Sequence, residues 1–302
     1  MLDSNWQDHG TFYKPNSTLA WSRTHAMIPT PFRMENNWRI YYSGRNNNNQ
    51  SSIGCFDLNI ENGASVISSE SKPILTPGKL GCFDDNGVSP SCVIKLRSGE
   101  IALYYIGWNP GSTTRVNLFG GLAISSDAGM NFTRWSEAPI LGRTKIDPYI
   151  NTAPWVVDLG DHYRMYYVSG VGWKDGASPS YNIKIAFSAD GYIWERNGQI
   201  AIDFKDLDET ALARPYVIFH DGIWKMWFSK RSGEYSIGYA ESFDGLEWIR
   251  KDNEFGLLPN GNGNQKLMSE YGIVLPERDR FWMLFNGDNY GYSGIEIASR
   301  ML

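Results

Sequence analysis

Residues 163–170, Tyr-Arg-Met-Tyr-Tyr-Val-Ser-Gly, form one of five aromatic segments that recur along this 302-residue chain. The other four are residues 38–44, 101–107, 224–229 and 281–287. The central pairs of the five segments begin at positions 41, 104, 166, 227 and 284, which gives steps of 63, 62, 61 and 57 residues. Self-similarity at such a period indicates several copies of one supersecondary unit.

Each copy contains further strand signals around its aromatic segment. About a dozen residues earlier lies a short apolar segment, which in four copies contains a proline: Pro29, Pro90, Pro154 and Pro215. Proline cannot donate to a ladder, so it belongs at the start of a strand or at an edge. A third strand follows the aromatic one, and a fourth, short strand follows a tight turn in three copies. Four antiparallel strands repeated five times predict an all-β, five-bladed β-propeller.

The predicted propeller occupies residues 1–302 as a single domain, with blades at approximately 22–80, 81–142, 143–205, 206–262 and 263–302. The last copy stops after its third strand. Residues 5–12 resemble the fourth strand at residues 193–200, so we expect the N-terminal strand to complete the last blade and close the ring. A closed ring leaves few exposed edge strands.

Composition narrows the class of protein. Hydrophobic residues make up 42% of the chain and aromatic residues 14%, enough for a large core, and the net charge is −5. Without a basic tract, nucleic-acid binding has little electrostatic support. No signal-peptide pattern and no run of 18 apolar residues is present, so we expect no membrane span. Cys55, Cys82 and Cys92 lack metal spacing, which favours a reduced, cytoplasmic compartment and no metal or cofactor.

Strand direction sorts the loops onto two faces of the predicted propeller. The segments before each first strand and after each second strand share one face and converge on the central channel. The Asp-Gly turns at residues 190–191 and 244–245 lie on the other face. There Asp and Gly serve turn geometry, so we assign these turns to the scaffold.

Four acids lie in the converging segments and are the candidate catalytic residues: Asp84, Asp85, Glu209 and Glu270. One acid can protonate a leaving oxygen while a second acts as base or nucleophile. Asp84 and Asp85 can equally be turn residues, and Glu209 can form an ion pair with Arg214. The favoured pair is Asp85 with Glu209 or Glu270.

The same segments supply the candidate substrate contacts: His25, Arg45, Trp108, Tyr149, Asn151, Trp173, Arg214 and Arg231. Aromatic rings stack on the C–H face of a sugar, and amides or carboxylates bind its hydroxyls. The arginines suggest that the small-molecule or oligosaccharide substrate carries an anionic group. His25 can also be a structural histidine.

Taken together, the blade pattern, the prolines and the acids at the channel mouth resemble the five-bladed propeller glycosidase superfamily of arabinanases, invertases and mannoside phosphorylases. Segments such as Phe83 to Pro90 and Ala213 to Pro215 also resemble uncharacterised propeller proteins of bacterial surface-glycan gene clusters. The resemblance implies a hydrolase, transferase or phosphorylase acting in surface-glycan metabolism. The first blade has His25 where hydrolases of the superfamily carry an aspartate, so a non-catalytic sugar-binding propeller is the alternative.

Overall fold

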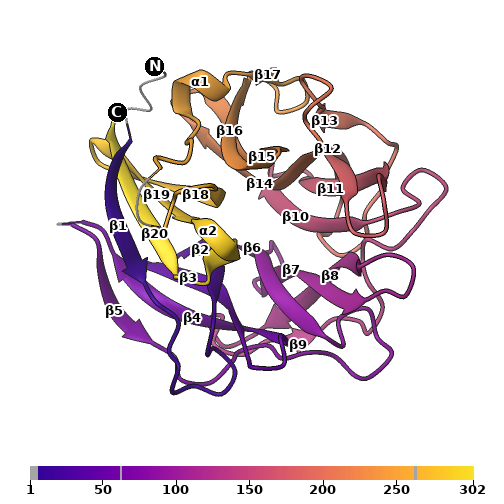
Figure 1. Ribbon diagram of the computed structural model, residues 1–302, viewed down its shortest axis with the longest axis horizontal. Helices are drawn as coiled ribbons and strands as arrows, with labels where there is room; N and C mark the ends of the chain where they lie inside the picture. The colour runs from indigo at the N-terminus through magenta and orange to yellow at the C-terminus, as the bar shows by residue number, and fades with distance from the viewer. Residues whose placement is uncertain (1–5, 62, 262–263) are drawn as a thin grey trace.

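The computed structural model describes residues 6–61, 63–261 and 264–302 of the chain. Its strands fall into five consecutive antiparallel sets arranged around a common centre (Figure 1). Besides these strands, the described residues form two one-turn helices, α1 (Asp252–Phe255) and α2 (Asp288–Gly291). The all-β fold expected from the sequence is confirmed. Of the N-terminal segment 5–12, Asn5 lies outside the described residues.

The first four sets follow the chain from inside to outside. Set one is β2 (Ala26–Arg33), β3 (Trp38–Arg45), β4 (Ser51–Asn59) and β5 (Ser65–Ser69). Set two is β6 (Gly87–Lys95), β7 (Ile101–Pro110), β8 (Val116–Ser125) and β9 (Thr133–Arg134). Set three is β10 (Asn151–Asp158), β11 (Tyr163–Trp173), β12 (Pro179–Ser188) and β13 (Ile200–Ile202). Set four is β14 (Ala211–His220), β15 (Ile223–Ser232), β16 (Glu234–Ser242) and β17 (Ile249–Arg250).

The fifth set combines the two ends of the chain. It consists of β18 (Glu270–Glu277), β19 (Arg280–Asn286), β20 (Ile295–Met301) and β1 (Gln7–Tyr13). The N-terminal β1 pairs antiparallel with the C-terminal β20. This set is a separate four-stranded sheet, whereas single parallel bridges between β4 and β6, β8 and β10, and β12 and β14 join the other sets.

Tyrosines of the second strands link neighbouring sets. The hydroxyls of Tyr41, Tyr104 and Tyr166 donate to the carbonyls of Gly129, Gly191 and Gly245, at 2.8, 2.7 and 2.7 Å. All three glycines have positive φ, and a Cβ on Gly129 would lie 2.3 Å from the Tyr41 oxygen. Only glycine combines that backbone with so close an approach. These turns are scaffold, as the sequence indicated.

Most of the core lies between the sets. The largest cluster of buried apolar residues draws on all five sets and includes Tyr42, Tyr104, Tyr167, Trp227 and Phe285, none of which is more than 1% exposed. Aromatic side chains of this size bury large apolar areas and favour strands. The space between neighbouring sets is therefore packed with side chains.

Candidate functional site

Each of the five innermost strands is interrupted by a β-bulge at the same place. The pairing register shifts near Ile28, Pro90, Ala153, Arg214 and Tyr271. Ile28, Ala153, Arg214 and Tyr271 adopt φ between 48° and 57°. Such a conformation costs about 1–3 kcal/mol for a non-glycine residue and is concentrated at functional sites. A bulge also redirects a side chain away from the regular pleat.

Residues at or next to the five bulges line one cavity of about 600 Å³ at the centre of the molecule. Ile28, Ser89, Ala153, Arg214 and Tyr271 contribute to its wall, one from each set. The remaining wall comes from the ends of the second strands and the starts of the third, as expected from the strand directions. Ligand cavities commonly have about 300–1,000 Å³, so this one is large enough for a sugar.

Arg214 is the most deeply buried charge of the cavity, at 1% exposure. Its Nη1 donates to the Ser91 carbonyl at 2.8 Å, and its Nη2 donates to the Pro29 carbonyl and to Thr30 Oγ1 at 2.9 and 2.7 Å. It therefore connects β14 with β6 and β2. Its Nε has no hydrogen-bond partner among the described residues. Burial lowers the pKa of Arg214 to about 10, so the guanidinium stays charged at neutral pH.

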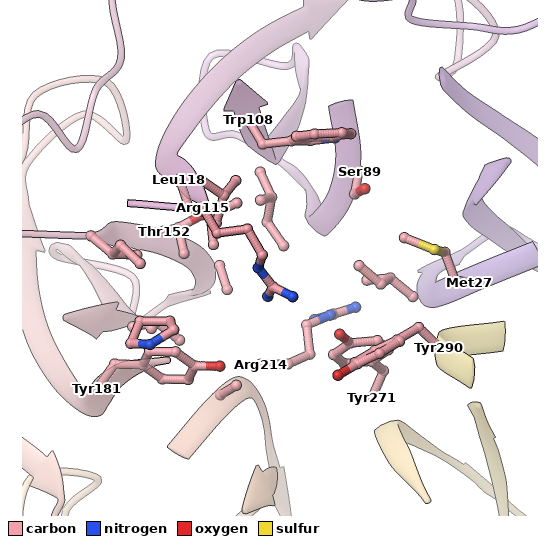
Figure 2. A pocket seen from close by; sticks show the side chains of 18 of the residues that line it. Met27, Ser89, Trp108, Arg115, Leu118, Thr152, Tyr181, Arg214, Tyr271 and Tyr290 are labelled. Atoms are coloured by element: carbon pink, nitrogen blue, oxygen red, sulfur yellow. The ribbon is translucent and has the colours of Figure 1, made fainter. Parts of the chain in front are cut away.

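Three more arginines line the cavity: Arg45, Arg115 and Arg231. Arg231 is held by Thr210 Oγ1 and by the Pro179 carbonyl, at 3.1 and 3.0 Å. Burial lowers the pKa of the Arg45 guanidinium, and the nearby charge of Arg115 acts in the same direction. Figure 2 shows the guanidinium groups of Arg115 and Arg214 directed toward the middle of the cavity. The site is strongly cationic although the chain as a whole is acidic.

Aromatic and phenolic side chains complete the wall. Trp108 donates from Nε1 to Ser51 Oγ at 2.9 Å, which fixes the orientation of its ring. Tyr181 and Tyr235 share a hydrogen bond between their hydroxyls, and the ring of Tyr235 meets that of Tyr290 edge-on with centroids 6.5 Å apart. Tyr271 lies beside Tyr290 (Figure 2). Phenols that neighbour a flat indole are suited to bind sugar hydroxyls while the ring stacks.

Glu270 is the acid most closely associated with the cavity. It opens β18, it is fully buried, and neither carboxyl oxygen has a hydrogen-bond partner in the part of the chain that the structure describes. Burial raises its pKa well above the ordinary value, and the side chain of Tyr271 and the Arg45 charge oppose this only in part. Its carboxyl interacts electrostatically with Tyr181, Tyr271 and Tyr290, all of which line the cavity. The raised pKa favours the neutral form of this carboxyl, which neighbours the phenolic side chains of the wall.

The other predicted acids lie outside the cavity wall, and two of them belong to a repeated ion pair. In sets two, three and four, an acid before the first strand meets an arginine on or near the outermost strand. The pairs are Asp84 with Arg134, Asp147 with Arg196, and Glu209 with Arg250. Asp84 also accepts from Tyr105 at 3.0 Å, and Glu209 accepts from Arg250 Nη2 at 2.8 Å. Glu209 is thus paired with Arg250 rather than with Arg214. Asp85 accepts from the Gly81 N–H at 2.8 Å, within its own loop.

The predicted substrate contacts divide in the same way. Arg45, Trp108, Arg214 and Arg231 line the cavity, whereas His25, Tyr149, Asn151 and Trp173 are not part of its wall. His25 is bonded to Thr24 at 2.8 Å, and burial lowers its pKa to about 4. Asn151 donates to the carbonyls of Gly142 and Asp147, at 3.1 and 2.9 Å. Tyr149 is 40% exposed.

The cavity also contains residues that we did not single out from the sequence: Arg115, Tyr181, Tyr235, Tyr271 and Tyr290. Tyr271 and Tyr290 lie in the segments expected on this face. Tyr271 occupies the same position in its first strand as Arg214 does in its own. This correspondence is visible in the sequence and could have identified Tyr271 as a residue of the cavity wall. Arg115, Tyr181 and Tyr235 lie at or just before the starts of third strands, where the sequence pattern offered no comparable signal.

Replacing Asp147 by asparagine is expected to lower the free energy of unfolding at pH 7 by about 3–5 kcal/mol, because Lys184 and Arg196 lose their buried partner. Asp147 accepts from Tyr167, Ser169 and Lys184 at 2.9, 2.9 and 2.8 Å. Burial alone would raise its pKa, but these hydrogen bonds hold it below the ordinary value.

Urea denaturation of both proteins from pH 7 to pH 3 measures this effect. A depressed carboxyl pKa contributes stability that is present above the unfolded pKa of about 4 and is lost as the pH falls through the folded pKa. The difference between the two proteins should therefore shrink in acid. The exposed Asp158→Asn is the matched control in the same set, and an Asp147 variant as stable as this control would contradict the expectation.

Three further properties of the described residues concern metal sites, cysteines and membrane-spanning helices. They contain no group of three or more His, Cys, Asp or Glu side chains placed to hold a metal ion. Cys55, Cys82 and Cys92 are free thiols. Within the same residues, neither helix has the length or the apolar surface that crossing a bilayer requires.

The amino-acid sequence of this chain is similar to those of several known proteins. No family model matches it. It is 38% identical to the uncharacterised protein Rv1502 of Mycobacterium tuberculosis over 295 residues, which are 97% of this chain and 98% of the relative. It is 29% identical to a 1,2-beta-oligomannan phosphorylase of Thermoanaerobacter over 107 residues, which are 34% of this chain and 36% of the relative.

The fold of this chain is similar to those of several solved structures. One described as a glycoside hydrolase has a TM-score of 0.73 at 17% identity and covers 98% of this chain and 92% of its own. A structure from the GH130 family of mannoside phosphorylases has a TM-score of 0.70 at 12% identity and covers 97% and 94%. At these identities the similarity concerns the fold alone, and it agrees with the all-β fold that the sequence resemblance implied.

Proposed function

We propose that this chain, which belongs to the same family as the Mycobacterium tuberculosis protein Rv1502, is a carbohydrate-active enzyme that transfers a glycosyl group in its central cavity. In the proposed reaction Glu270 is the source of the proton and the hydroxyl of Tyr271 passes it on. The oligomannan phosphorylase and the propellers with glycoside hydrolase descriptions support a glycosidic substrate. The orientation of Trp108 at the cavity wall also suits a sugar ring.

One observation carries the proposal, the buried and unpaired carboxyl of Glu270. A general acid must hold its proton at the working pH, and burial in apolar surroundings is the usual means of keeping a carboxyl neutral. Because Glu270 is fully buried, it reaches the cavity through Tyr271, whose phenol lines the wall. Tyr271 donates its proton to the leaving oxygen as the glycosidic C–O bond breaks, and Glu270 protonates the phenolate.

The nucleophile follows from the composition of the wall. No residue that lines the cavity in the described parts of the chain carries a carboxyl group. Most glycoside hydrolases have two carboxyl groups that face each other across the glycosidic bond. In this proposal a single acid, Glu270, takes the place of that pair. The new bond to the anomeric carbon is formed by a second substrate, as in a phosphorylase or a transferase, and the proton that this substrate loses restores the Glu270 carboxyl by way of Tyr271. Glu270 is retained from the predicted acids, and Asp84 and Glu209 take structural roles in ion pairs.

Two finer statements belong to the same proposal. The five strand sets are the blades of a five-bladed propeller, and the pairing of β1 with β20 closes its ring. The enzyme acts in the cytoplasm, which the unpaired cysteines favour, and in surface-glycan metabolism, which the resemblance of the segment from Phe83 to Pro90 suggests.

Replacing Tyr271 by phenylalanine should lower turnover about 100-fold, because it removes the proton-passing hydroxyl and keeps the ring. The assay follows product release from β-1,2-linked mannosides and aryl glycosides, with and without inorganic phosphate. Tyr292→Phe is the matched control, since Tyr292 is 57% exposed and does not line the cavity. Wild-type turnover by the Tyr271 variant would remove Tyr271 from the proposed reaction.

The lack of a carboxyl on the described cavity wall also favours a second candidate, a sugar-binding propeller without catalysis. Calorimetry and product analysis on the same substrate panel separate the two functions. Binding without product, under every condition with and without a phosphate acceptor, would establish the second function in place of the first.

A further inference from the structure

The charge of the cavity identifies the class of substrate. Four guanidinium groups line it, no carboxyl group belongs to its described wall, and burial raises the pKa of the nearby Glu270. Glu234, an exposed residue at the β15–β16 turn, is the other acid that interacts with Glu270 and with Tyr290. It lies at the rim and is solvated, so it does not neutralise the interior. A cavity with this balance binds an anion.

The donors left free by the protein show where the anion binds. An arginine has five N–H donors. Arg214 gives three of them to protein oxygens, and its buried Nε is unpaired within the described residues. Arg115 lies in the loop between β7 and β8. The N–H of Gly111 donates to the Arg115 carbonyl at 3.3 Å, and the N–H of Arg115 donates to the Gly176 carbonyl at 2.6 Å. These backbone bonds hold the loop in place and leave the guanidinium of Arg115 for a ligand.

We propose that the cavity binds a phosphorylated sugar, with the phosphoryl group held between Arg115 and Arg214. A phosphoryl group has three acceptor oxygens and a charge of about −1.5 to −2 at pH 7, so it can bind two guanidinium groups that approach from opposite directions. A carboxylate offers one charge and two oxygens in one plane, which suits a single arginine. The sugar part of the ligand lies against Trp108 and the tyrosines, and this assignment rests on the proposed function.

The location of Tyr290 supports a single binding site. Its phenol interacts with Glu270, Arg115 and Arg231, and Tyr271 interacts with Glu270 and with Arg45. The cationic groups, the proton source and the phenolic wall are thus within interaction range of one another. A substrate whose phosphoryl group lies between Arg115 and Arg214 therefore places its sugar next to the proton source.

Isothermal titration calorimetry with four probes tests the proposal: mannose 1-phosphate, mannose, inorganic phosphate and glucuronate. The sugar phosphate is expected to bind at least 10-fold more tightly than mannose or glucuronate. Arg115→Ala should weaken its binding about 10- to 100-fold, the loss expected for one charge-assisted partner, and leave mannose unaffected. Arg115 is exposed, so the variant should keep its fold. Arg143→Ala, an exposed arginine of the neighbouring loop outside the cavity wall, is the matched control.

The remaining outcomes are equally decisive. If inorganic phosphate binds as tightly as the sugar phosphate and loses the same affinity in Arg115→Ala, the phosphoryl site stands and its occupant is free phosphate. If glucuronate binds most tightly, or if Arg115→Ala changes no affinity, the phosphoryl site is overturned. That failure would leave the proposed function intact, because its own test is turnover by the Tyr271 and Glu270 variants.

Discussion

Replacing Glu270 by glutamine should reduce turnover about 100- to 10,000-fold, the range expected for loss of a general acid. The same substitution should make the protein more stable at neutral and alkaline pH. The two effects have one cause, because the carboxyl that is useful as a proton source is costly to bury once it ionises. A residue with a purely structural role would not combine a loss of activity with a gain in stability.

The sign of the stability effect follows from proton linkage. The folded-state pKa of Glu270 lies well above the unfolded value, so between the two pKa values the native state holds a proton that the unfolded state has lost. Stability from this group is fully present below the unfolded pKa of about 4.3 and falls by up to about 1.4 kcal/mol per pH unit above it. Glutamine does not titrate. The variant and the wild type should therefore diverge as the pH rises from 4 to 8.

Urea denaturation at pH 4, 6 and 8, together with pH–rate profiles, measures both effects. Glu277→Gln on the same strand is the matched control, since Glu277 is partly exposed and pairs with Arg33 at 3.5 Å. The proposed role of Glu270 also predicts that Tyr271→Phe and Glu270→Gln together cost little more than either alone, because the two residues act on one proton. Full activity of Glu270→Gln, or a stability difference independent of pH, would contradict the proposal.

The tyrosine pairs explain why the sequence was informative about the strands. The first tyrosine of a pair reaches the glycine turn of the next set, as Tyr104 does at Gly191, and the second can reach the acid before its own set, as Tyr167 does at Asp147. Both partners recur with the period of the repeat. A pattern with that period predicts a scaffold, and here it predicted the fold class.

The residues of the candidate site differ from one copy of the repeat to the next. For this reason the sequence predicted the site less well than the fold. Asp84 and Glu209 were candidate catalytic acids because they lie in the segments before first strands, but in the structure these positions hold ion pairs with Arg134 and Arg250. Arg214 and Tyr271 occupy the same bulge position as the apolar Ile28 and Ala153. At these equivalent positions the residue type changes from set to set, so the period of the repeat does not predict which side chains line the cavity.

The segment from Trp6 to Tyr13 should be essential for the stability of the whole protein and not only of the set to which β1 belongs. Trp6 is buried and donates from Nε1 to the Phe255 carbonyl at 3.2 Å, which connects it to α1 after the fourth set. Tyr13 stacks on Phe56 of the first set with ring centroids 4.2 Å apart, and its hydroxyl donates to Tyr42 at 3.2 Å. One short segment therefore contacts the sets on both sides of the fifth set.

Deleting residues 1–13 is expected to abolish cooperative unfolding. Tyr13 is half-buried, so Tyr13→Ala should lower the free energy of unfolding by about 2–3 kcal/mol, somewhat less than truncating a fully buried aromatic residue. Native-state hydrogen exchange on Tyr13→Ala distinguishes ring closure from local support. Closure predicts faster exchange in β18–β20 and also in β2–β4, because both ends of the ring lose their junction. Tyr149→Ala, at a residue that is 40% exposed, is the control. Exchange that increases in the fifth set alone would make β1 an ordinary edge strand, and the ring would then be held closed by other contacts.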